Sequence, residues 1–420
     1  MRGGNSRHTR NLRYLHRSGN EYVSGAYPEE EFWNDLLRVT RGRTNEHLAR
    51  MVIRRSADLP AWMESQGCRF QKPLRGTLGL SRTNIFFRGG GKALMNAWYT
   101  RALDLGVQVS YDTEVLDVEL DRGRCHAVRV RDGQGERRLT TKALVLASGG
   151  FQANIPWLKE YWGDAAENFI IRGTPFNQGR MLRVMLDKGA GSAGDPRQCH
   201  AVAIDARAPV FDGGIVSRLD CVPFGIVVNA EARRFYDEGE DIWPKRYAIW
   251  GRLVADQPGQ TAWVIVDHKA ISLFMPSLFP PHEAGSPAEL AEILGLDGAE
   301  LEKTVAAFNQ AVQPGSFNGD APDGCRTRDL TPPKSNWART LDTPPYYAWP
   351  LRPGITFTYL GLKVDDRARV LVGDEPAANI YAAGEIMAGN ILGQGYMGGL
   401  GMTIGAVFGR IAGEEAAGCV

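Results

Sequence analysis

The sequence predicts an α/β protein in which one sheet-containing domain is split along the chain by an inserted α+β domain. A continuous apolar run at 142–151 closes in two glycines, as expected for a parallel strand buried on both faces. A second apolar strand, at 380–383, leads through a glycine-rich loop into a helix predicted over 400–417. Apolar runs at 224–229 and 262–267 predict the strands of the inserted domain.

Elements upstream of residue 142 fit the first of these domains. The glycines at 89–91 open an amphipathic helix predicted over 92–105, and a strand is predicted at 108–110. The runs 113–120 and 125–131 predict a hairpin closed by a polar turn. These elements belong to the first half of the split domain.

The inserted domain is expected to act as a cap. It has an acidic turn at 237–241 and a helical stretch from about 286 to 312. The proline-rich segment 329–345 opposes both helix and sheet, so we interpret it as the return linker. The predicted boundaries are 1–199 and 345–420 for the split domain and 200–344 for the cap.

Composition excludes several classes of protein. Hydrophobic residues make up 43% and charged residues 23% of the 420 residues, and the net charge of +1 gives no basic excess for nucleic acid. No apolar run is long enough to span a membrane, and the first residues lack the apolar core of a signal peptide. The six cysteines show no metal-ligand spacing, so we expect no metal or iron–sulfur site and a reducing, cytoplasmic environment.

The glycine-dense loop near the C-terminus carries the strongest ligand signal. Glycines at 393, 395, 398, 399 and 401 let backbone approach a ligand closely, and the following helix start offers unpaired N–H groups. This order suits the phosphate and ring system of a flavin. The alternative is a small-residue helix that packs tightly on the sheet.

A family resemblance rests on five of these segments. The helix at 92–105, the strands at 108–110 and 113–118, and the segments 147–150 and 382–385 resemble the flavoprotein family of fumarate reductase and succinate dehydrogenase. The resemblance implies a Rossmann-like FAD-binding domain with an inserted capping domain, and FAD as the cofactor.

Three further segments narrow the resemblance. Residues 2–13, 243–252 and 395–402 resemble the tricarballylate dehydrogenases of that family, and also the flavoprotein half of the aerobic precorrin-3B synthase. The first resemblance implies oxidation of tricarballylate, a small polycarboxylate, to cis-aconitate by hydride transfer to flavin N5. Electrons would pass to a membrane-bound iron–sulfur and haem partner, with the protein cytoplasmic or peripheral at the inner membrane face. A precorrin-3B-type flavin oxygenase and a non-catalytic truncated remnant stay open as alternatives.

A dinucleotide-binding flavoprotein is expected to begin with a strand, a G-x-G-x-x-G turn and a helix. The chain shows no such pattern at its start, so we expect that the first βαβ unit is missing and that the chain retains FAD poorly.

The resemblance also implies the residues that contact FAD. The N-terminal residues would wrap its pyrophosphate and ring, Glu385 would accept hydrogen bonds from ribitol hydroxyls, and Val115 would contact the adenine through its backbone. The predicted cofactor-binding residues are Gly3, Gly4, Asn5, Ser6, Val115, Ser148, Gly149, Gly384, Glu385, Gly399, Gly401 and Met402.

By the same resemblance, His200 is a substrate ligand and catalytic residue, and Arg246 or Arg252 passes the proton. Free arginine is a poor base, so such a role needs a carboxylate neighbour from the acidic turn at 237–241.

The substrate residues depart from the fumarate reductase pattern. Thr356 and Thr358 stand where that family has histidines, and Tyr396 stands where it has an arginine, so fumarate and succinate are disfavoured as substrates. The lost cationic contacts could be replaced by an arginine at 172, 180 or 352.

Overall fold

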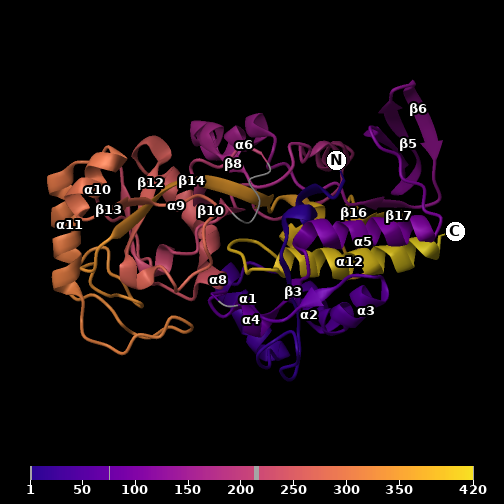
Figure 1. Cartoon of the computed structure of the whole chain (residues 1–420). Helices are drawn as coiled ribbons and strands as arrows, with labels where there is room; N and C mark the ends of the chain where they lie inside the picture. The colour runs from indigo at the N-terminus through magenta and orange to yellow at the C-terminus, as the bar shows by residue number, and fades with distance from the viewer. Residues whose placement is uncertain (1, 75, 212–216, 420) are drawn as a thin grey trace.

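The computed structural model describes residues 2–74, 76–211 and 217–419. Figure 1 shows helices α10 and α11 with the cap sheet at one end of the molecule, and helices α5 and α12 with the C-terminus at the other. The mixed α/β architecture with an inserted cap is confirmed.

The split domain is built on a three-stranded sheet in the order β16-β17-β7. Strand β17 pairs in parallel with β7 and antiparallel with β16, so segments more than 200 residues apart in sequence share one sheet. Helix α12 packs on this sheet (Figure 1). The bounds are β7 (Leu144–Leu146), β16 (Arg369–Val372), β17 (Glu375–Ala382), α5 (Gly90–Asp104) and α12 (Leu400–Ala417).

Two expectations about this domain need correction. The apolar run 142–151 forms a strand only over β7, because its chain turns into a loop at the two glycines. The strand predicted at 108–110 is absent, since no described strand lies beside it to pair with its backbone. The helices predicted over 92–105 and 400–417 and the hairpin are confirmed, and a third strand, β6, extends the hairpin. The hairpin strands are β4 (Glu114–Asp121), β5 (Arg124–Asp132) and β6 (Gly135–Thr140).

Residues 11–87 add a helical layer beneath α12 (Figure 1). Its short sheet has the order β1-β3-β2. The elements are β1 (Asn11–Arg13), β2 (Phe70–Gln71), β3 (Asn84–Phe87), α1 (Glu29–Thr40), α2 (Glu46–Arg55), α3 (Leu59–Ser65) and α4 (Leu80–Thr83). Helices α6 (Ile155–Trp162) and α7 (Arg180–Asp187) and the paired strands β9 (Ser192–Ala193) and β15 (Gly361–Leu362) precede or follow the cap.

The cap is a second sheet, in the order β10-β14-β12-β11, with β8 and β13 also paired to β14. Its outer helices pack on a separate apolar cluster. The bounds are β8 (Ile170–Ile171), β10 (Cys199–Asp205), β11 (Ile226–Asn229), β12 (Ala262–Asp267), β13 (His282–Ala284), β14 (Tyr346–Thr358), α8 (Trp243–Arg246), α9 (Trp250–Ala255), α10 (Pro287–Leu294) and α11 (Gly298–Ala311).

The helical stretch predicted from about 286 to 312 is confirmed and consists of two helices, α10 and α11. Gly295, at φ 70°, ends α10 in the left-handed conformation that glycine adopts at little cost. The side chain of Asp297 then accepts a hydrogen bond from the backbone N–H of Glu300 at 2.9 Å and starts α11.

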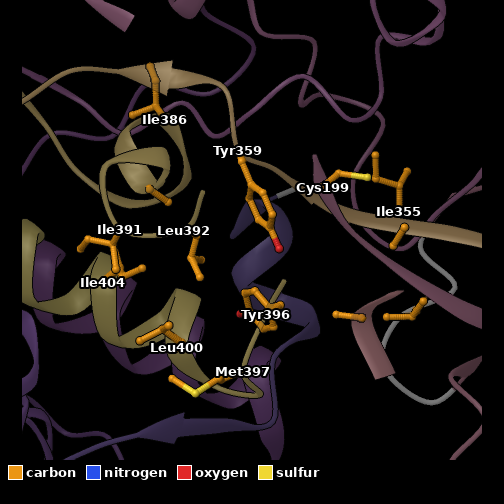
Figure 2. Packing of buried hydrophobic residues seen from close by; sticks show 14 of the residues in the cluster. Cys199, Ile355, Tyr359, Ile386, Ile391, Leu392, Tyr396, Met397, Leu400 and Ile404 are labelled. Atoms are coloured by element: carbon orange, nitrogen blue, oxygen red, sulfur yellow. The ribbon is translucent and has the colours of Figure 1, made fainter. Parts of the chain in front are cut away.

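Strand β14 joins the cap to the split domain, because it runs through the cap sheet and ends at Thr358 beside Glu385. Figure 2 shows Tyr359 and Tyr396 between two groups of apolar side chains. Cys199 and Ile355 of the cap lie on one side, and Ile391, Leu392 and Leu400 of the split domain lie on the other.

Among the described residues, we find no helix whose length and apolar character would let it cross a membrane.

The buried side chain of Asn379 ties the hairpin to the central sheet. Its Oδ1 accepts from the backbone N–H of Cys125 at 2.8 Å, and its Nδ2 donates to the carbonyls of Cys125 at 2.8 Å and Lys142 at 2.7 Å. The side chain therefore links β17 to β5 and to the segment before β7 through three hydrogen bonds.

We expect Asn379→Leu to lower the free energy of unfolding by about 3 kcal/mol, because it leaves buried backbone groups unpaired. Urea unfolding measures this change. Asn96→Leu, on the exposed face of α5, is the control and should change stability by less than about 0.5 kcal/mol. Equal effects of the two substitutions would contradict the role of Asn379.

Candidate functional site

A cavity of about 700 Å³ lies where the N-terminal segment, the ends of β7 and β17, α12 and the cap meet. The structure brings most of the predicted cofactor residues to this cavity. Those that line it are Gly3, Gly4, Asn5, Ser6, Ser148, Gly149, Gly384, Glu385, Gly399, Gly401 and Met402. Of the predicted substrate residues, Thr356, Tyr396 and His200 line it as well.

Glycines on one face of α12 give the cavity its long, flat wall. Gly401, Gly405 and Gly409 follow one another at a spacing of four residues, so they share a face of the helix. A Cβ on Gly409 would meet no atom within 4 Å, and one on Gly405 would meet only the Cα of Gly384, at 3.7 Å. Side chains here would occupy space that an extended cofactor such as FAD needs, so these residues fit the expected cofactor.

Glu385 also lines the cavity, and its carboxyl group accepts hydrogen bonds from neighbouring protein groups. Its Oε1 accepts from the backbone N–H of Thr358 at 2.9 Å, and its Oε2 accepts from Gln152 at 3.2 Å. Burial raises the pKa of the Glu385 carboxyl to about 7, although these hydrogen bonds oppose the rise. Thr358 therefore orients Glu385 and does not line the cavity itself.

Val115 is also outside the cavity lining. It pairs with Val130 across the hairpin. Its predicted backbone contact to adenine stays a prediction.

Three arginines converge at the cap end of the cavity. They are Arg10, Arg172 and Arg218, and all three line it. Arg218 forms a buried ion pair with Asp220, with Nη2 donating to Oδ2 at 2.8 Å, and Arg10 lies 3.7 Å from the same carboxylate. Arg172 donates to the hydroxyl of Thr356 at 2.6 Å. Three guanidinium groups thus come together at this end of the cavity, and two of them, those of Arg10 and Arg218, lie beside the carboxylate of Asp220.

The pKa values reflect this crowding. Burial and the charge of Arg218 lower the pKa of both Arg10 and Arg172 to about 10. Burial would raise the pKa of Asp220, but Arg218 and Arg10 outweigh it and lower that pKa below its usual value. All three guanidinium groups therefore stay charged at neutral pH, and the site attracts anions.

His200 faces this cluster from strand β10, directly before a bulge in its pairing with β14. Its ring stacks on Tyr396 with centroids 4.0 Å apart and meets the edge of Tyr247 at 5.2 Å. Neither ring nitrogen has a hydrogen-bond partner among the described residues, although the side chain is buried. Burial and the charges of Arg172 and Arg218 hold its pKa well below the ordinary value, so the imidazole is neutral. A buried, neutral imidazole whose ring nitrogens lack a hydrogen-bond partner among the described residues is suited to hydrogen-bond to a ligand.

The two arginines predicted to pass a proton are placed elsewhere. Arg246 donates to Glu240 and to the hydroxyl of Tyr236, and Arg252 lies over the ring of Trp162. Neither lines the cavity. The expected carboxylate neighbour of Arg246 is present as Glu240, and the catalytic roles of both arginines stay predictions.

Sequence reasoning did not single out Arg10, Arg218 or Tyr247 as site residues. Arg172 was one of three arginines considered, and the others are engaged elsewhere, since Arg180 pairs with Glu114 and Arg352 donates to a backbone carbonyl. The only signal for Arg218 is a carboxylate two residues later, a spacing common in any strand.

Among the described residues, no three potential metal-ligating side chains lie close enough to hold a metal ion.

Comparison with known proteins identifies relatives of this arrangement. A family model described as FAD binding domain matches residues 20–401. The NADH:fumarate oxidoreductase of Klebsiella pneumoniae (strain 342) is 26% identical over 93% of this chain and 41% of its own length. The 4-oxocyclohex-2-ene-1-carboxylate 5-dehydrogenase of Sinomonas cyclohexanicum is 30% identical over 79% of this chain and 60% of its own length. The chain thus spans less than two thirds of the length of either relative.

Solved structures share the fold. The open conformation of a flavocytochrome c3 fumarate reductase aligns with a TM-score of 0.74 at 22% identity, covering 99% of this chain and 72% of that one. A 3-ketosteroid Δ1-dehydrogenase from Sterolibacterium denitrificans gives a TM-score of 0.74 at 18% identity, covering 99% and 93%. At these identities the likeness concerns the fold alone.

We expect Gly405→Leu to weaken FAD binding at least about tenfold, because the side chain enters the cavity. Leucine also favours helix over glycine by up to about 1 kcal/mol, so lost FAD would not reflect an unfolded helix. Flavin retained per chain after gel filtration measures the effect. Gly413→Leu, exposed on the same helix, is the control, and a parallel loss of flavin there would contradict the assignment.

Glu385 gives a pH prediction. Because its folded pKa of about 7 lies above the ordinary 4.5, the folded state binds the proton more tightly, and this stabilisation is lost as pH rises from 4.5 to about 7. Glu385→Gln removes the titrating group, so we expect the wild type to lose up to about 3 kcal/mol relative to the variant between about pH 4 and pH 8. Urea unfolding without added flavin measures this difference in stability. A difference between wild type and variant that does not change with pH would refute the raised pKa of Glu385.

Proposed function

The chain belongs to the FAD binding domain family, and we propose from this premise that it is an FAD-dependent oxidoreductase that oxidises a CH–CH bond of a polycarboxylate. We propose tricarballylate as the substrate and cis-aconitate as the product.

The observation that supports this proposal is the convergence of three arginine side chains on the cap end of the cavity. Guanidinium groups attract anions, so the lining formed by Arg10, Arg172 and Arg218 favours a ligand that carries carboxylates. Arginine also suits carboxylates geometrically, because its planar fork can donate two parallel hydrogen bonds. Tricarballylate supplies three carboxylates on a saturated three-carbon chain.

Different residues of the chain have different roles in the proposed reaction. The glycine face of α12 and the N-terminal segment 3–6 hold the cofactor, and FAD, when bound, supplies a hydride acceptor. His200 is neutral and can donate a hydrogen bond to a carboxylate without adding charge. The stacked ring of Tyr396 orients that imidazole.

The names of several relatives support a carboxylate as the substrate. They name fumarate, acrylate, urocanate and 4-oxocyclohex-2-ene-1-carboxylate, each a carboxylate with an unsaturated carbon chain or ring, and fumarate among them carries two carboxylates. The proposed electron acceptor is a separate membrane-bound iron–sulfur and haem protein, which rests on the sequence resemblance.

The test is anaerobic addition of tricarballylate to the FAD-loaded protein. We expect bleaching of the flavin's visible band and formation of cis-aconitate. Oxidised flavin that tricarballylate leaves unchanged would refute the substrate.

We expect His200→Ala to lower kcat/KM for tricarballylate at least about tenfold, equivalent to about 1.4 kcal/mol of transition-state stabilisation. Steady-state rates with an artificial electron acceptor measure this. His126→Ala, on the exposed face of β5, should leave the rate unchanged. Equal rates for wild type and His200→Ala would remove His200 from the site.

A further inference from the structure

Tyr247 is a buried phenol at the centre of the arginine cluster. It opens the short helix η6 (Tyr247–Ile249) of the cap, lines the cavity and is 3% exposed. Its hydroxyl reaches the glycine-rich loop, since a Cβ built on Gly398 would lie 3.9 Å from it. The cap thus places a hydroxyl against the wall of the cofactor cavity.

The surroundings of this phenol are cationic. The guanidinium carbon of Arg218 lies 4.4 Å from the centroid of its ring. Arg172 and Arg10 are also close enough to lower the pKa of Tyr247, whereas Asp220 raises it. The rings of His200 and Tyr396 complete the enclosure, each with an edge-to-face contact. Three guanidinium groups would stabilise a phenolate at this position.

Among the described residues at this end of the cavity, the charged groups and His200 are less suited to accept a proton. The guanidinium groups hold their protons at neutral pH. Asp220 is engaged by Arg218 and by the indole N–H of Trp243 at 2.8 Å. His200 is kept neutral with its pKa well below the ordinary value, which makes it a weak base.

We propose that Tyr247 exchanges the proton with the substrate carbon, a role that rests on the proposed function. One C–H bond of the substrate breaks, and its hydride leaves with both electrons to FAD, the oxidant. The neighbouring C–H bond also breaks; its electron pair forms the C=C bond, and its proton bonds to the phenolate oxygen of Tyr247. In the reverse direction the phenol donates that proton.

The pH dependence follows from the same surroundings. Burial raises the pKa of Tyr247 above the ordinary value for a phenol, although Arg218, Arg172 and Arg10 oppose the rise. Oxidation requires the phenolate, so its rate should increase as the pH rises above neutral while Arg10 and Arg172, with pKa values of about 10, stay protonated, whereas the reverse reduction should slow.

The first experiment measures anaerobic flavin reduction by tricarballylate in the FAD-loaded protein as a function of pH. We expect Tyr247→Phe to slow reduction at least about 100-fold, to abolish the alkaline rise and to change the Kd of tricarballylate less than about threefold. Tyr347→Phe, on β14 beside His268, is the control and should retain the wild-type rate and pH profile. A Tyr247→Phe rate within about threefold of wild type would overturn the proposal.

Arg246→Lys provides the competing test, because Arg246 is the proton-transfer residue that the sequence predicts. A loss as large as that of Tyr247→Phe, with the alkaline rise gone, would overturn the role of Tyr247. If flavin reduction in Arg246→Lys keeps the wild-type pH profile, the result supports proton transfer by Tyr247.

A second measurement does not depend on turnover. The ultraviolet difference spectrum between wild type and Tyr247→Phe during a pH titration reports the ionisation of this one phenol. We expect tricarballylate to raise its pKa further, because bound carboxylates neutralise the arginines. An unchanged titration overturns the proposal. If wild-type flavin is not reduced by tricarballylate, the proposed substrate fails, and this titration alone decides whether Tyr247 faces the bound anion.

Discussion

Three guanidinium groups that converge on one end of the cavity are the constraint on which the rest of the site depends. Removing arginine from water is unfavourable unless partners replace the lost hydration. Asp220 neutralises one charge, the Thr356 hydroxyl accepts from Arg172, and the ring of Tyr247 lies against Arg218. Burial and the positive charges of Arg172 and Arg218 together keep His200 neutral, and the arginine lining favours an anionic ligand at this end of the cavity.

The opposite end of the cavity has a different requirement, which is space. Glycines replace side chains along one face of α12, and the ends of β7 and β17 bring Gly149 and Gly384 beside that face. The cofactor cavity and the anion site are therefore continuous but chemically distinct. The boundary between them is formed by Tyr396 and the end of β14, the same elements that join the cap to the split domain.

Arg246 and Tyr247 show how one position along the chain changes the chemistry that a residue can perform. Both belong to the same short helical segment of the cap. The side chain of Arg246 is bound by Glu240 and Tyr236, whereas the next side chain points to the arginine cluster. Sequence position alone therefore indicates only the segment that could transfer the proton. The direction in which each side chain points then indicates the residue.

The sequence by itself determined the fold class, the cofactor and most of the cofactor wall, because glycine patterns and buried strand ends are local features that survive without tertiary information. The sequence resemblance also selected His200, and the structure places that side chain in the lining of the cavity. Only the tertiary structure decided the anion site, because Arg10, Arg172 and Arg218 come from three distant segments whose charges no periodicity distinguishes from those of surface arginines. The strand predicted at 108–110 was wrong for a related reason, since a strand needs a neighbour whose backbone pairs with it.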